Sequence, residues 1–204
     1  MLQYHSLVRR DETTGAYVSG PRLIEIAFGI LRRFDDRLQL HPQLERLSAE
    51  LGETVHLALL SGTDVAFVDG VEGSRPVKTT LRLGFRRPAH WVSTGKALLA
   101  TLDAEQLREL YPEKKLPTYT EKSIGDRATL ETDLALVRER GYATSIGESE
   151  VDVAAVAVTV YDERAHPVGA IGVSVPMSRF SEDELERLLA PLRKVAEEVR
   201  LSGF

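Results

Sequence analysis

The residues that most suggest chemistry are a glycine and a lysine near the middle of the chain. Gly95 and Lys96 resemble the end of a phosphate-binding loop, which also needs a glycine five residues before Gly95 and a serine or threonine after the lysine. His90 and Ala97 stand at those two positions, so the motif does not predict nucleotide binding. Residues 93–95 instead favour a helix start, with Lys96 solvated in the first turn. The free N–H groups of such a start are an alternative site for a small carboxylate.

A second candidate is Ser174, within the sequence GVSVP at residues 172–176. A nucleophile elbow requires a glycine two residues after the serine, and Pro176 occupies that position. The histidines are scattered, with no pair at metal-ligand spacing, and cysteine is absent. The absence of cysteine excludes a thiolate nucleophile and a cysteine-ligated metal. The sequence therefore predicts no catalytic residue, no metal site and no cofactor.

Charged residues gather in two further places. Glu148, Glu150 and Asp152 are spaced by two, which puts them on one face of an extended segment. A solvated face explains this spacing more simply than a role in ligand selection. Three arginines between residues 82 and 87 flank a glycine and Phe85. They too are expected to be solvated, although such a loop is also suited to covering an anionic ligand.

Composition and charge limit the class of protein that positions these residues. The chain has 204 residues, of which 43% are hydrophobic and 28% charged, as is ordinary for a soluble globular protein. The net charge is −5, without the strongly basic surface of a self-sufficient nucleic-acid binder. No secretory signal begins the chain, and its longest apolar run, 151–160, is about half a membrane span. We therefore expect a cytoplasmic protein with no membrane partner.

The periodicity of apolar residues predicts an α+β fold. Helical spacing and helix-end signals alternate with runs of β-type residues that are mostly joined by short turns, which implies an antiparallel sheet with helices packed on it. The expected strands span residues 6–10, 16–20, 54–60, 65–71, 77–83, 151–161 and 168–175. The expected helices span residues 21–40, 42–51, 127–140 and 182–201, with one or two short helices between 98 and 110.

Five stretches in register resemble the IclR family of bacterial transcription regulators. They are LVRRDETTGAYVSGPRLIEIA, ELGETVHLALLSGTDVAFVD, STGKALLATL, LALVRERGYATSIGE and VAVTVYDERAHPVGAIGVSVPMSRFSEDEL. A family member normally carries a winged helix-turn-helix, a linker helix and a ligand-binding domain similar to the GAF fold. The resemblance thus implies three parts: a wing hairpin remnant at 1–20, a linker helix at 21–42 and a GAF-like effector-binding domain at 43–204.

The resemblance departs from the family pattern at the start of the chain. The helix-turn-helix should precede the wing hairpin, but only seven residues precede Val8. We therefore expect no specific DNA binding by this chain alone. In a full-length protein, Arg9 and Arg10 on the wing are the expected contacts to operator DNA.

The family resemblance also implies an effector pocket between the sheet and the STGKA segment. Carried over by position, the ligand-binding residues are Ser93, Thr94, Gly95, Ala155, Gly172 and Ser174. Leu98, Leu116, Ile146 and Val153 are candidates for additional apolar lining. Relatives often carry a cysteine at the place of Ala155 and a serine at that of Gly172, so this pocket is expected to form fewer hydrogen bonds and to suit an aromatic or larger acid.

The function implied is allosteric. A small carboxylic acid that prefers one arrangement of a homodimer or homotetramer would change the binding of operator DNA. Linker helix 21–40 is the expected dimer interface; packing of its apolar stripe on its own domain is the alternative. Two other functions stay open, an enzyme that uses Ser174, His90 or Lys96 in the same pocket, and a ligand-free dimerisation module.

Overall fold

The computed structural model describes residues 3–11, 13–22, 25 and 40–201. The chain forms two units, Met1–Leu40 and His41–Phe204, which are described separately. Most of the expected linker helix lies outside the described residues. Among the described residues, no helix combines the length and the apolar character that crossing a bilayer requires.

The first unit contains the expected β-hairpin. Strands β1 (Val8–Arg10) and β2 (Tyr17–Ser19) pair antiparallel. Asp11 holds the turn, because its Oδ1 accepts the N–H groups of Thr13 and Thr14 at 3.0 and 2.8 Å, and Gly15 supplies a positive φ of 70°. Arg9 and Arg10 lie on β1 and are exposed. Their contact with DNA, and the identity of the hairpin as a wing, stay predictions.

The second unit is built on one antiparallel sheet, so the α+β prediction is confirmed. Its strands lie in the order β5-β4-β3-β8-β7-β6, and every neighbouring pair is antiparallel. The strands are β3 (Thr54–Ser61), β4 (Asp64–Val71), β5 (Arg86–Pro88), β6 (Ala143–Ile146), β7 (Val153–Tyr161) and β8 (Pro167–Pro176). The central strand β8 carries more of the sheet residues that bound the site than any other strand does.

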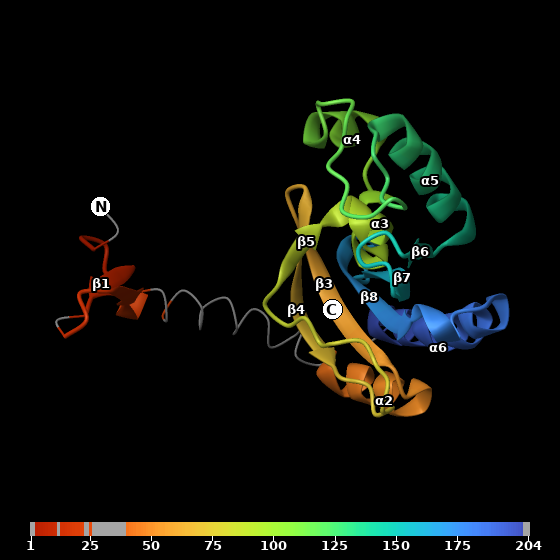
Figure 1. Ribbon diagram of the computed structural model, residues 1–204, viewed down its shortest axis with the longest axis horizontal. Helices are drawn as coiled ribbons and strands as arrows, with labels where there is room; N and C mark the ends of the chain where they lie inside the picture. The colour runs from red at the N-terminus through yellow and green to blue at the C-terminus, as the bar shows by residue number, and fades with distance from the viewer. Residues whose placement is uncertain (1–2, 12, 23–24, 26–39, 202–204) are drawn as a thin grey trace. The chain divides into compact units, whose positions relative to one another are not determined.

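Helices cover both faces of this sheet (Figure 1). Helices α2 and α6 contact each other and pack on β3, β4, β7 and β8, whereas α3 packs on β3, β6, β7 and β8 from the other side and contacts α5. The helices are α2 (His41–Leu51), α3 (Ser93–Leu99), α4 (Ala104–Leu110), α5 (Arg127–Arg140) and α6 (Glu182–Leu201), with short 3-10 turns η1 (Ala89–Trp91) and η2 (Met177–Arg179). Because α3 lies between the sheet and α5, all seven of its residues are buried.

The strand expected at 77–83 is absent, and the edge strand beside β4 is β5 instead. The polar groups of this segment bond to side chains rather than to a strand partner. The carbonyl of Thr79 accepts the hydroxyl of Thr54 at 2.6 Å, and the N–H of Arg82 donates to His56 Nε2 at 3.1 Å. Strand β6, which follows α5 and closes the far edge of the sheet, was not expected from the sequence.

Candidate functional site

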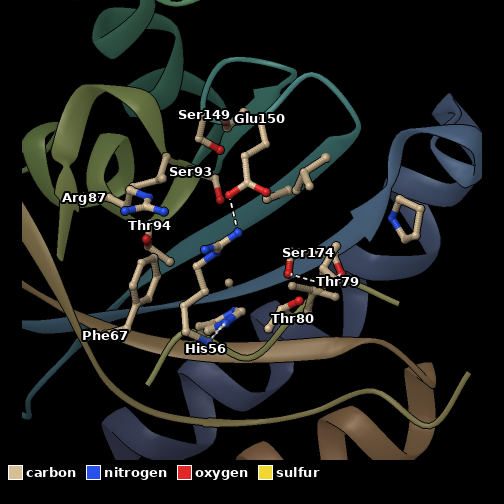
Figure 2. A pocket seen from close by; sticks show the side chains of 18 of the residues that line it. His56, Phe67, Thr79, Thr80, Arg87, Ser93, Thr94, Ser149, Glu150 and Ser174 are labelled. Atoms are coloured by element: carbon tan, nitrogen blue, oxygen red, sulfur yellow. Dashed lines mark hydrogen bonds and ion pairs between the residues drawn. The ribbon is translucent and has the colours of Figure 1, made fainter. Parts of the chain in front are cut away.

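One pocket of about 290 Å³ opens where the sheet, the start of α3 and two loops meet (Figure 2). Every strand of the sheet, β3 to β8, contributes at least one lining residue, and α3 contributes its first turn. One loop, residues 77–82, belongs to the segment between β4 and β5, and the other, residues 147–152, connects β6 to β7. Ser149 and Glu150 lie on one side of the pocket, opposite His56 and Phe67.

Five of the six expected ligand-binding residues line this pocket. They are Ser93, Thr94, Ala155, Gly172 and Ser174, and their role in ligand binding stays a prediction. Gly95 is not among the lining residues; a Cβ there would lie 2.1 Å from the carbonyl oxygen of Ala89. Residue 95 is therefore glycine because α3 packs closely on η1, and this packing leaves no space for a side chain. Of the additional apolar residues expected in the lining, Val153 is present and Leu98, Leu116 and Ile146 are not.

Gly172 and Thr94 fit against each other in the pocket wall. A Cβ at Gly172 would lie 2.7 Å from Thr94 Cγ2, so the threonine can adopt this position only because residue 172 is glycine. Thr94 is buried, and its hydroxyl has no hydrogen-bond partner among the described residues. A buried hydroxyl without a partner costs free energy, and a polar ligand in the pocket would relieve that cost.

His56 forms part of the pocket as a neutral group. Burial, followed by the positive charge of Arg82, lowers the pKa of His56 to about 4. The imidazole accepts the backbone N–H of Arg82 at its Nε2, which leaves the proton on Nδ1. The His56 side chain is buried on β3, and its hydrogen bond fixes the position of the Arg82 backbone.

Ser174 has partners that do not suit a nucleophile. Its hydroxyl lies 2.7 Å from the hydroxyl of Thr79, which also donates to the Ser174 carbonyl at 3.1 Å. A second, longer contact of 3.5 Å reaches the Thr54 carbonyl. Neither partner is a general base, and activating a serine needs one. The serine instead joins the segment at 77–82 to strand β8.

Arginine side chains give the pocket its positive charge. Arg82 forms an ion pair with Glu150 across the pocket. Arg87, on β5, has no carboxylate partner among the described residues, and its Nη1 donates only to the carbonyl of Arg86 at 3.3 Å. Both arginines and Glu150 are half-buried, so the expectation that they are simply solvated is wrong.

Comparison with known proteins decides the family. Residues 28–201 match the family model described as "Bacterial transcriptional regulator IclR C-terminal". The chain belongs to the IclR family. It is 31% identical to the acetate operon repressor of Salmonella typhimurium over 203 residues, which is 98% of this chain and 74% of that protein. It is 30% identical to the regulator XynR of Escherichia coli over 193 residues, covering 95% of this chain and 77% of that protein.

Solved IclR-family structures share the fold. The IclR protein of Thermotoga maritima has a TM-score of 0.79 and 31% identity, covering 98% of this chain and 81% of that one. The inducer-binding domain of PobR from Acinetobacter, solved as a double mutant in complex with 3-hydroxybenzoic acid, has a TM-score of 0.73 and 30% identity. It covers 79% of this chain and 95% of its own. The described fold is therefore that of an IclR effector-binding domain, which senses a ligand in transcription regulation.

One expectation about this IclR domain is wrong: Lys96 is buried, not solvated. Only 1% of the residue is exposed, because α3 is covered by the sheet and α5. Its Nζ lies 2.8 and 2.9 Å from the two carboxylate oxygens of Glu148, and 3.2 Å from Asp133 Oδ2. Lys96 thus ties α3 to α5 and to the loop at 147–152. The apolar residues 97–99 follow Lys96 directly, which is compatible with a buried lysine but does not identify its carboxylate partners.

Proposed function

We propose that this pocket binds a small carboxylic acid as the effector of an IclR-type transcription regulator. One observation carries the proposal: the pocket is lined both by Arg87 and by Thr94. In the part of the chain that the structure describes, the Arg87 guanidinium has no carboxylate partner and the buried Thr94 hydroxyl has no hydrogen-bond partner. A guanidinium and a hydroxyl are the donors that a carboxylate takes in charge-assisted hydrogen bonds.

The charge and size of the pocket support the same class of ligand. Three cationic residues and two carboxylates line it, and His56 is neutral, so one positive charge is in excess. These five residues are Lys78, Arg82, Arg87, Glu150 and Asp152. A volume of about 290 Å³ lies at the small end of ligand pockets. The PobR domain bound to 3-hydroxybenzoic acid is a relative with a ligand of this chemistry.

The proposed role is regulatory and without catalysis. The acid would stabilise one of two arrangements of a homodimer or homotetramer in the cytoplasm, with linker 21–42 carrying the interface. Arg9 and Arg10 on the hairpin would contact operator DNA in the full-length regulator. Coupling of about 1–3 kcal/mol between effector and operator would change DNA affinity roughly 5–150-fold.

Thermal unfolding against a panel of acids tests the ligand class. Benzoate, 3-hydroxybenzoate, pyruvate and butyrate are suitable, because an acid at 100 times its Kd adds about 2.7 kcal/mol of stability. We expect at least one acid to raise the Tm, and Arg87→Gln to abolish the rise. The matched control is Arg86→Gln, since Arg86 is the neighbouring arginine on β5 but pairs with Asp64 outside the pocket. Equal effects of both substitutions, or no rise with any acid, would contradict the proposal.

A second variant tests the position of the site. Gly172→Ala places a Cβ against Thr94, which should cost about 1–3 kcal/mol in overpacking and fill the pocket beside the hydroxyl. We expect the variant to fold with a lowered Tm and to lose the rise given by the acid. Gly169→Ala is the control, because it adds the same methyl group to the same strand away from the pocket, where no neighbour would lie closer than 3.2 Å to the Cβ. Retention of the acid response by Gly172→Ala would place the effector elsewhere.

A further inference from the structure

The two pocket arginines differ in their partners. Arg87 has no carboxylate partner among the described residues, whereas the guanidinium of Arg82 is paired with the carboxylate of Glu150. In Figure 2 the dashed line from Glu150 marks this ion pair within the pocket. The third cationic residue of the lining, Lys78, is paired with Glu72. The Arg82–Glu150 pair therefore occupies one of the two arginines at which the pocket could bind an acidic group.

Both partners of the ion pair are held in place by contacts outside it. The N–H of Arg82 donates to His56 Nε2, and His56 is buried on β3. The loop that carries Glu150 is anchored before it by the bond from Lys96 to Glu148. After Glu150, the carbonyl of Asp152 accepts the N–H of Met177 at 2.7 Å. Glu150 can therefore leave Arg82 by a movement of its side chain, while these anchors stay in place.

We propose that Glu150 restricts the effector of this pocket to monocarboxylic acids, by occupying the arginine that would otherwise receive a second carboxylate. The inference rests on the proposed function, in which Arg87 and Thr94 bind the first carboxylate. A dicarboxylic acid would have to displace Glu150 from Arg82 and would also meet its negative charge. A monocarboxylic acid leaves the ion pair intact.

The cost of displacing Glu150 follows from how often the ion pair is formed. The apparent affinity of a ligand is reduced by the fraction of molecules in the competent state. If the pair is open in about one molecule in ten, removing Glu150 tightens dicarboxylate binding about tenfold by the same relation. Affinity for a monocarboxylate that uses only Arg87 does not change by this route.

Calorimetric titration of matched acids tests the proposal. 3-Hydroxybenzoate and isophthalate differ only in whether a hydroxyl or a carboxylate stands at the meta position, and butyrate and succinate form a similar aliphatic pair. We expect Glu150→Gln to bind the dicarboxylate of a pair about tenfold or more tighter than the wild type does. The monocarboxylate should change by less than about twofold. The double variant Arg82→Gln/Glu150→Gln should lose the gain, because no second guanidinium remains for the ligand.

The control variant is Glu121→Gln. It removes the same charge from an exposed residue next to Thr120, whose hydroxyl donates to the Gly147 carbonyl in the same loop, but Glu121 does not line the pocket. We expect it to leave the ratio of the two affinities unchanged, and melting curves establish that each variant is folded.

The outcomes separate this inference from the proposed function. If the wild type binds monocarboxylates and Glu150→Gln gains nothing for dicarboxylates, the role of Glu150 is refuted while the effector site stands. An equal gain for both acids of a pair, or the same gain in Glu121→Gln, also refutes it. If no acid binds to the wild type or to any variant, both proposals fail.

Discussion

Lys96, Glu148 and Asp133 place two carboxylates around one buried ammonium. Burial raises the pKa of Glu148, and the charge and hydrogen bond of Lys96 oppose that rise. Asp133 Oδ2 lies 3.2 Å from the ammonium and has no hydrogen-bond partner within the described part of the chain. The positive charge of Lys96 therefore offsets the free-energy cost of burying Glu148. The same contact anchors the loop that carries Glu150 to the pocket.

Replacing Lys96 by methionine should destabilise the protein strongly and in a pH-dependent way. Removing one partner of a buried ion pair typically costs about 3–5 kcal/mol. Without the ammonium the folded-state pKa of Glu148 rises further above its ordinary value of 4.5, so the folded state binds the proton more tightly than the unfolded state. That contribution to stability is fully present below the unfolded pKa and is lost as pH rises through the folded one.

Urea unfolding at pH 5 and pH 7.5 measures the effect. We expect the loss of stability in Lys96→Met, relative to the wild type, to be smaller at pH 5 than at pH 7.5. Lys194→Met, which removes an exposed lysine on α6, should change stability by less than about 0.5 kcal/mol at both pH values. A loss in Lys96→Met that is the same at both pH values would show that the proton on Glu148 does not determine it.

At the scale of elements, helix starts are set by contacts within four residues. Asp103 Oδ1 accepts the N–H groups of Glu105 and Gln106 at 2.8 and 2.9 Å, and Gln106 Oε1 accepts the Asp103 N–H at 2.9 Å. This reciprocal capping box satisfies N–H groups that the helix itself leaves free. An aspartate followed three residues later by a glutamine can be recognised as a capping motif without information from distant residues.

Asp103→Ala should cost about 1 kcal/mol, as is typical for loss of an N-cap. Because α4 contributes no residue to the pocket, effector binding should be unaffected. Urea unfolding measures the stability, and amide hydrogen exchange should accelerate at residues 105 and 106. Glu109→Ala, a charge removal near the other end of α4, is the control with little change expected. An equal loss in both variants would mean that the charge, and not the cap, stabilises the helix.

The segment between β4 and β5 shows where element prediction fails. Residues 77–83 alternate in a way that favours a strand, yet they pair with no strand. Their polar groups bond instead to Thr54, His56 and Ser174, which lie on the central strands. A segment with high β-propensity forms a strand only where a neighbouring strand is free to pair with it. Here β5 occupies the edge position beside β4, so residues 77–83 have no strand to pair with.

For the whole molecule, the division of the chain into two units predicts that the second unit binds the effector without the first. Every residue that lines the pocket belongs to the unit His41–Phe204. A fragment that starts at residue 41 keeps His41, whose Nδ1 lies 2.9 Å from Asp69 Oδ1 on β4. Its N-terminal helix α2 is thereby held to the sheet by this contact as well as by its buried leucines.

We expect this fragment, residues 41–204, to show the same acid-induced rise in Tm as the full chain. Sedimentation velocity on both proteins then reports assembly: the full chain should run at two or four times its mass of 22.6 kDa. A smaller assembly for the fragment is expected if linker 21–42 carries the interface. Loss of the acid response in a fragment that still unfolds cooperatively would show that the first unit takes part in binding.

The sequence by itself determined the family, the α+β class, most helix ends, the long strands and six of the residues that line the pocket. The elements follow from local periodicity and helix caps. The family and the pocket residues follow from stretches that match family members in the same order along the chain. Only the tertiary structure decided that Lys96 is buried, that Arg82 pairs with Glu150, and that Gly95 serves packing. The partners in the two ion pairs lie 52 and 68 residues apart in sequence. Packing of distant elements brings them together, and no local pattern encodes that choice.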